Sequence, residues 1–153
     1  MEDIWNITAL VVSVLSVLLS LYALRQATTK NTSDMYLFFI SQYAKEDMKL
    51  ALRKLKDIKR GVYRLEQWES DMKNNLPKAF EYDEARRLVK YFYDTLAYMK
   101  LEKLIEARFV RLICLKKGAW LYLDTVEAME KFFDSGFDKK PYAVSRDVCE
   151  NLR

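Results

Sequence analysis

The chain has 153 residues, of which 51% are hydrophobic and 31% are charged, and its formal net charge is +4. This length suits one small domain plus an additional element, and so mild a charge does not by itself indicate a nucleic-acid partner. With only 3 glycines and 2 prolines, the composition favours long helices over a turn-rich β architecture.

Residues 4–24 read IWNITALVVSVLSVLLSLYAL and carry no charge. As a helix they would extend about 31 Å, close to the hydrocarbon thickness of a bilayer, so we expect a transmembrane helix here. Trp5, Tyr22 and Arg25 are then expected to lie at the membrane interfaces. The alternatives are a buried core helix or a cleaved signal peptide. Residues 1–3 are acidic where a signal peptide is basic, which favours an uncleaved signal anchor.

The charges that flank this segment predict its orientation. Acidic residues precede it, and the following forty residues are rich in Lys and Arg. By the positive-inside rule, residues 1–3 are a short extension outside the membrane, and the rest of the chain is cytoplasmic. The expected location is therefore the prokaryotic inner membrane, with a single pass.

Small or polar residues recur along one face of this helix, at steps of three and four. They are Asn6, Ala9, Ser13, Ser16, Ser20, Ala23 and Ala27. In lipid, such a seam allows the backbone of a second helix to approach closely, so it predicts a helix–helix contact with another membrane protein or a second copy of this chain. The alternative is that each serine bonds back to a carbonyl of its own helix.

The remaining chain is expected to form a polar hinge over residues 25–34, a helical cytoplasmic domain over 35–136 and a tail over 137–153 with at most one short helix. Thr32 or Ser33 is a candidate helix cap at the end of the hinge. The predicted fold class is all-α, with one transmembrane helix followed by a small bundle of five or six short helices.

Residues 45–60 predict an amphipathic helix that ends at Gly61. Its apolar stripe consists of Met48, Leu52, Leu55 and Ile58. A second, basic stripe consists of Lys49, Arg53, Lys56 and Arg60. Beside a membrane, such a basic stripe can contact anionic lipid, while an ordinary solvated helix face is the alternative.

Further helices are expected from 65 to 72, from 83 to about 99, and over most of residues 106–136. Trp68 is a candidate core residue, and Asp83 suits the exposed first turn of its helix. Breaks are expected at the NNLP stretch that ends at Pro77, near residues 99–105, and at Gly118.

No stretch of the sequence carries a recognisable catalytic motif. With no histidine, the commonest general base and metal ligand are missing, and 3 glycines could not form a phosphate-binding loop. The acidic sets at 102/106 and at 124/127/130 alternate with Lys and Arg as solvated helix faces do. Cys114 lies in an apolar helical context and is interpreted as a buried free thiol, and two cysteines, Cys114 and Cys149, do not establish a disulfide. We therefore expect no enzyme activity, no cofactor and no metal.

The stretches SQYAKEDMKLALRKLKD, RRLVKYFYDTLAYMKLEKLI, ARFVRLICLKKGAWLYL and TVEAMEKFF follow one another in this order. In this the chain resembles a group of uncharacterised prokaryotic proteins with one N-terminal membrane helix and a small cytoplasmic helical domain of unknown function. That group has a glycine-containing turn where this chain has Lys103, Leu104 and Ile105. The resemblance implies a topology and no catalytic residue.

Two functions are consistent with these features. The first is a membrane-anchored, non-catalytic interaction subunit that docks through its transmembrane helix and binds or stabilises a larger membrane complex. The second is a self-associating sensor or effector at the membrane surface, whose basic helix contacts anionic lipid. Neither function calls for a nucleic-acid partner.

Overall fold

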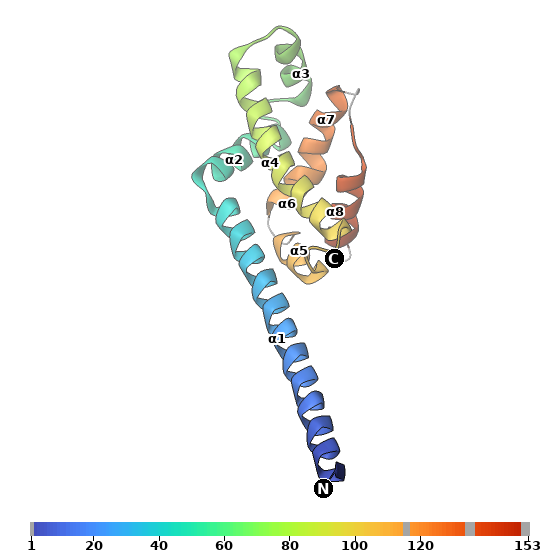
Figure 1. Ribbon diagram of the computed structural model, residues 1–153. Helices are drawn as coiled ribbons and strands as arrows, with labels where there is room; N and C mark the ends of the chain where they lie inside the picture. The colour runs from blue at the N-terminus through green and yellow to red at the C-terminus, as the bar shows by residue number, and fades with distance from the viewer. Residues whose placement is uncertain (1, 115–116, 134–136, 151–153) are drawn as a thin grey trace. The chain divides into compact units, whose positions relative to one another are not determined.

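The computed structural model describes the backbone of residues 2–114, 117–133 and 137–150. Side chains are described for these ranges except at residues 2–12, 14, 25, 28, 29, 31, 32, 107, 113 and 114. The structure is 86% helix and no strand occurs in the described part of the chain, which confirms the all-α prediction (Figure 1). The chain divides into two compact units, residues 1–37 and residues 38–153.

The helices follow one another with short connections. They are α1 (Glu2–Ala44), α2 (Glu46–Lys59), α3 (Leu65–Lys73), α4 (Pro77–Leu101), α5 (Ala107–Cys114), α6 (Lys117–Leu121), the π-helical turn η1 (Tyr122–Val126), α7 (Glu127–Phe133) and α8 (Lys140–Glu150).

The prediction of a transmembrane helix over residues 4–24 is wrong. Within the described residues, no helix contains an apolar stretch long enough to cross a membrane. The predicted single pass, signal anchor and inner-membrane location are corrected with it. Trp5, Tyr22 and Arg25 accordingly lose the basis of their assignment as interface anchors.

The expected break in the chain at residues 25–34 is also absent. α1 continues through this segment as one helix of 43 residues, so neither Thr32 nor Ser33 caps a new helix. The segment contains many polar residues but no Pro or Gly, and polar residues at solvent-facing helix positions cost only a few tenths of a kcal/mol each. Polarity alone therefore does not end this helix.

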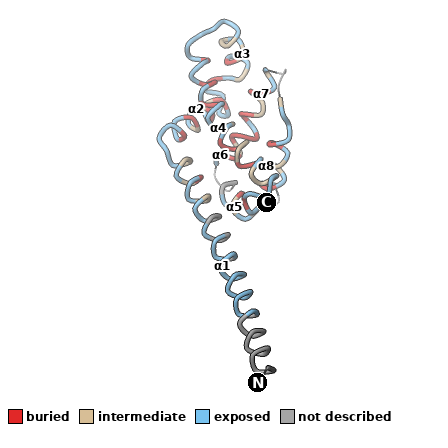
Figure 2. Tube along the Cα trace, in the orientation of Figure 1, coloured by how far each residue is buried: buried red, intermediate tan, exposed pale blue. Residues whose placement is uncertain are grey.

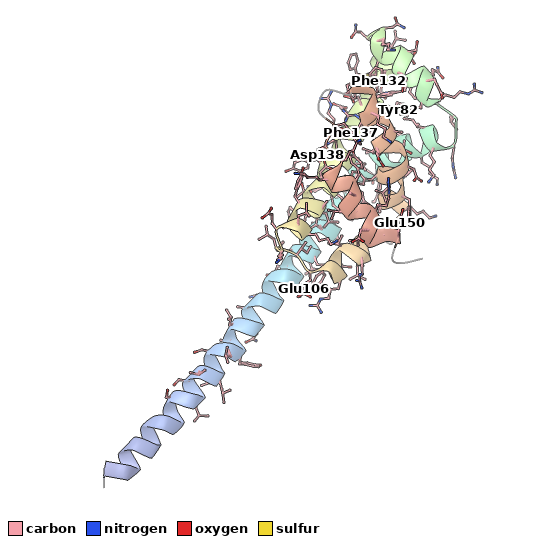
Figure 3. All side chains as sticks on the ribbon, turned by 90° about the vertical axis from the view of Figure 1, so that its right-hand side faces the viewer. Tyr82, Glu106, Phe132, Phe137, Asp138 and Glu150 are labelled. Carbon is pink, nitrogen blue, oxygen red and sulfur yellow. The ribbon has the colours of Figure 1, made fainter. Side chains whose placement is uncertain are left out.

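The second unit is built around α4, which contacts α2, α3, α5, η1 and α8. Figure 2 shows the buried positions gathered where these elements meet. The most deeply buried apolar side chains include Leu55, Trp68, Val89, Leu96, Val126 and Met129. In Figure 3, Tyr82 and Phe132 lie toward the end of this unit that carries α3, and Glu106 lies toward the other end.

The connection between α2 and α3 follows the predicted pattern. α2 ends one residue before Arg60, and Gly61 adopts a φ of 73°, a left-handed conformation that costs glycine little. Trp68 of α3 is completely buried, and the nitrogen of its indole ring donates a hydrogen bond to the Ala79 carbonyl at 3.2 Å. This bond ties α3 to the beginning of α4 and confirms Trp68 as a core residue.

α4 begins earlier than expected, at Pro77 instead of Asp83. Proline is favourable in the first turn of a helix because its missing N–H would have no partner there. Asp83 therefore lies inside the helix, where it is buried, in contrast to its predicted position in an exposed first turn.

The helix from residue 117 to residue 133 contains the π-helical turn η1 in its middle. A π turn accommodates more residues per turn than an α turn and so changes which side chains face the core. Here it buries Tyr122, Leu123, Thr125 and Val126 together. Tyr122 stacks on Tyr93 of α4 at a ring distance of 5.0 Å and on Tyr142 of α8 at 4.5 Å. The turn thereby joins three helices through aromatic contact.

Candidate binding surfaces

A shallow basic groove of about 250 Å³ lies between α2 and α6. Four cationic side chains line it, and no carboxylate does. The complete lining is Tyr43, Lys49, Leu52, Arg53, Lys56, Lys117, Gly118 and Leu121.

The basic groove forms because the two faces of α2 differ. The side chains of Met48, Ala51, Leu55 and Ile58 are buried, which turns the basic stripe outward. Leu52, which we predicted in the buried stripe, lines the groove and is only partly buried. α6 packs beside α2 and brings Lys117 to the same groove. The three cations that α2 provides are therefore joined in the groove by Lys117, which comes from a distant part of the chain.

Gly118 allows the wall of this groove to close. Its N–H donates a hydrogen bond to the Tyr43 hydroxyl at 3.2 Å. A Cβ atom at this position would lie 2.8 Å from the same hydroxyl oxygen and 2.7 Å from that of Tyr93. Gly118 is thus required for a close approach inside α6, and the prediction that it ends a helix is wrong.

Three of the four cations in the groove are not neutralised. Lys49 is 3.3 Å from Glu46 on the same helix. Arg53, Lys56 and Lys117 form no ion pair with any residue in the described ranges. Arg60, the fourth member of the predicted stripe, lies beyond the end of α2 and does not line the groove.

A second groove, which we call the apolar groove, lies between α4 and the segment formed by the end of α1 and α2. It consists of two adjoining depressions of about 330 Å³ each, which share Asp47 and Leu88. Large apolar side chains remain exposed in it: Phe38 (57%), Leu50 (49%), Leu88 (38%) and Tyr91 (74%).

The charges of the apolar groove lie mainly at its α2–α4 end. Lys54 and Glu81 neutralise each other there at 3.0 Å. Asp47 and Glu84 line the same depression and make no ion pair within the described part of the chain. This end therefore carries unneutralised negative charge, opposite in sign to the basic groove, while Lys45, which makes no ion pair within the described residues, adds one positive charge in the other depression.

The interior of the second unit contains a buried ionic cluster. The Arg86 side chain donates to Asp83 at 2.7 Å, pairs with Glu130 and lies over the ring of Phe133 at 4.7 Å. The side chains of Asp83, Arg86 and Glu130 are at most 10% exposed. The cluster connects α4 to α7 but is closed to a substrate, so its role is structural. Glu130 is thus not on a solvated face, contrary to prediction.

Three of the other acidic residues considered for chemistry are paired with cations, whereas Glu102 makes no ion pair within the described residues. Asp124 pairs with Lys59 at 2.5 Å, and Glu127 pairs with Arg146 at 2.5 Å. Glu106 is 2.7 Å from Arg108. No group of His, Cys, Asp and Glu in the described residues could hold a metal ion.

Beside the ionic cluster, Tyr122 donates a hydrogen bond to Asp94 at 2.5 Å. Burial, together with this bond and the negative charge of Asp94, raises the pKa of Tyr122 far above its ordinary value. The phenol therefore remains protonated and acts as a hydrogen-bond donor. Cys149 of α8 is buried and forms no disulfide within the described residues, whereas the side chain of Cys114, which we predicted as a buried thiol, lies outside the described set.

The predicted small-residue seam on α1 is only partly visible, because the side chains of Asn6 and Ala9 lie outside the described set. Ser13, Ser16, Ser20, Ala23 and Ala27 are all exposed. The Ser20 hydroxyl donates to the Ser16 carbonyl at 2.8 Å, which is the bond within one helix that we considered as the alternative. The seam as a helix–helix contact remains a prediction.

Comparison with known proteins adds no further evidence about these surfaces. No family model, no curated protein and no solved structure matches the chain. The resemblance noted in the sequence therefore stays a prediction, and the functional argument rests on the two grooves and on α1.

Proposed function

We propose that this protein is a non-catalytic interaction subunit whose helical unit binds an amphipathic helix of a partner protein in the apolar groove. The observation that carries the proposal is the exposure of Phe38, Leu50, Leu88 and Tyr91 around one continuous depression. Contiguous exposed apolar side chains with a polar rim are typical of protein interaction sites, whereas isolated ones are ordinary.

The shape and composition of the groove favour a helical occupant. Helices α2 and α4 form its walls, and a third helix could place apolar side chains between them at three- and four-residue spacing. Tyr91 lines the groove with most of its side chain exposed, and tyrosine is enriched among the residues that contribute most to binding at protein interfaces. We therefore expect Tyr91 to contribute strongly to binding.

The charge of the groove selects among such helices. Asp47 and Glu84 carry unneutralised negative charge at one end, so a partner with Lys or Arg beside its apolar stripe is favoured over an acidic one. The occupant we propose is thus a basic amphipathic helix.

A suitable assay measures the binding of two labelled model helical peptides to the full chain by fluorescence anisotropy. The peptides have the same leucine pattern and differ only in carrying Lys or Glu at the other positions. We expect the Lys peptide to bind, and Tyr91→Ala to weaken it about tenfold, or ~1.4 kcal/mol. Leu88→Ala is expected to weaken it by a smaller factor, because Leu88 is less exposed.

The matched control is Val62→Ala, since Val62 is 73% exposed but lines neither groove. This variant should bind the Lys peptide as the parent chain does. Equal binding of both peptides, or an equal loss in the Val62 and Tyr91 variants, would contradict the proposal.

A second contact is proposed for α1, because its described apolar side chains are uncovered within residues 1–37. They include Leu15, Leu18, Leu19 and Leu21, each between 53% and 68% exposed. We propose that another helix, from a second copy or from a partner protein, covers this part of α1 in the assembled state.

Substitution on two faces of α1 tests this contact. If the small-residue seam forms the contact, Ser16→Leu with Ser20→Leu should weaken association in sedimentation and cross-linking experiments, because the larger side chains would overpack a contact formed between small residues. Leu18→Ser with Leu19→Ser is the matched pair on the leucine face. If association is lost only in the leucine-face variant, the contact lies on that face. If both variants still associate, residues 16–20 do not form the contact.

A further inference from the structure

We propose that the basic groove between α2 and α6 is a binding site for a phosphate-bearing ligand. This site lies on a different surface from the apolar groove and does not depend on it. Arg53 and Lys56 of α2 and Lys117 of α6 converge on one depression that contains no carboxylate.

The distribution of charge in the basic groove indicates that its ligand is an anion. Exposed cations on protein surfaces are commonly interspersed with Asp and Glu, as Lys59 is with Asp124 in this chain. The three cations in the groove lack such partners among the described residues, so their mutual repulsion is relieved only by solvent or by a bound anion. A multiply charged anion would contact several of them simultaneously.

The types of side chain favour phosphate among anions. The Arg53 guanidinium can donate two parallel hydrogen bonds to a phosphate, whereas Lys56 and Lys117 act as point charges. Tyr43, whose hydroxyl already accepts the Gly118 N–H, places a phenol at the same wall, and phenols donate to phosphate oxygens.

The size and rigidity of the groove limit the ligand. A volume of about 250 Å³ is smaller than that of most pockets for drug-sized molecules, so it suits one or two phosphate groups with the rest of the ligand outside. Gly118 and Leu121, which line the groove, are buried in the helical unit, so this part of the site exists before a ligand binds.

The probe for this proposal is inorganic pyrophosphate, titrated calorimetrically into the full chain at low salt. We expect saturable binding that weakens as sodium chloride is raised, since salt screens exposed charges. Arg53→Gln and Lys117→Gln are each expected to reduce the affinity about tenfold, because each removes a direct charge contact.

Arg60→Gln is the matched control, since Arg60 belongs to the same sequence stripe but lies outside the groove lining. It changes the net charge by the same amount and should leave the affinity within about twofold, since exposed charges at a distance are screened. An equal loss in Arg60→Gln and Arg53→Gln would overturn the proposal, because it would indicate attraction by net charge alone.

Vesicles distinguish the two sources of a phosphate group. Phosphatidylcholine vesicles with and without phosphatidic acid are compared with pyrophosphate on the same variants. Binding only to vesicles with phosphatidic acid, lost in Arg53→Gln and kept in Arg60→Gln, assigns the phosphate to a lipid headgroup. Absence of binding to both pyrophosphate and phosphatidic acid would refute the site. Neither result changes the expectation for Tyr91→Ala in the apolar groove.

Discussion

The buried ionic cluster around Arg86 makes a specific prediction about stability. Replacement of Arg86 by methionine keeps an unbranched apolar chain but removes the guanidinium cation that pairs with Asp83 and Glu130. Both carboxylates are then left buried without this partner, at side-chain exposures of 1% and 10%. Removing one member of a buried ion pair commonly costs ~3–5 kcal/mol, and we expect the same loss of unfolding free energy here.

Arg87→Met provides the matched control. Arg87 contacts the same carboxylate of Asp83, but its side chain is 67% exposed. Solvent screens this pair, so its loss should cost less than ~1 kcal/mol. The two substitutions are chemically identical, and only the burial and partners of the arginine differ.

Urea unfolding followed by circular dichroism measures both variants. With a slope of about 2 kcal/mol per molar urea, Arg86→Met should shift the midpoint down by ~2 M and Arg87→Met by less than 0.5 M. In the triple variant Asp83→Leu, Arg86→Met, Glu130→Leu, most of the lost stability should return, since apolar replacements remove the uncompensated charges. Similar losses for Arg86→Met and Arg87→Met would refute the reasoning.

Further substitutions test local features of the helical unit. Trp68→Ala should lower the unfolding free energy by ~3–5 kcal/mol in the same urea assay, and Trp68→Phe by clearly less, because the ring volume is largely kept. Gly61→Ala should cost ~1 kcal/mol through the left-handed backbone alone, since nothing lies within 4 Å of its Cβ position. Gly118→Ala should cost ~1–3 kcal/mol because its Cβ would crowd two tyrosine hydroxyls, a loss visible as a lower midpoint. The hydrogen bond from Tyr98 lowers the pKa of Asp138 from its ordinary 3.8, and that same bond raises the pKa of Tyr98 to about 12. The stabilisation from this carboxylate is present above pH 3.8 and lost as the pH falls through the lowered pKa, so the difference between the parent chain and Asp138→Asn should disappear in acid. A difference that is independent of pH would contradict this.

Local sequence patterns were sufficient where each element is determined by its own residues. The apolar period of residues 45–60 predicted α2, and the break near residues 99–105 agrees with the gap between α4 and α5. Trp68 was correctly placed in the core. In these cases burial follows from helical spacing, which is visible within one or two turns.

Tertiary contacts determine the features that the sequence did not predict. Asp83 and Glu130 are buried because Arg86 lies between them, and an acidic residue alone predicts exposure. The π turn likewise has no pattern of its own, and it extends the buried set beyond the stripe expected from an α-helical period. The transmembrane prediction relied on hydropathy over residues 4–24, and the described helices did not meet the length and apolarity required.

The basic groove depends partly on a local sequence pattern and partly on tertiary packing. Lys49, Arg53 and Lys56 were predicted as one stripe because they share a helix face. Lys117 was missed, since only the packing of α6 on α2 brings it there. Arg60 was predicted but lies outside, because α2 ends at Lys59.

The stacked rings of Tyr93, Tyr122 and Tyr142 provide the chain with an intrinsic optical reporter. Tyr122 and Tyr142 lie nearly parallel, with 9° between their planes, and parallel chromophores at such a separation couple their electronic transitions. This group contributes to the near-ultraviolet dichroism of the chain, and its contribution depends on the packing of α8 on η1 and α4. The chain has 3 tryptophans, so the fluorescence of Trp68, whose ring contacts Phe132, reports the packing of α3 in a variant with Trp5→Phe and Trp120→Phe. In that variant the packing of α3 can be followed during unfolding without an added label.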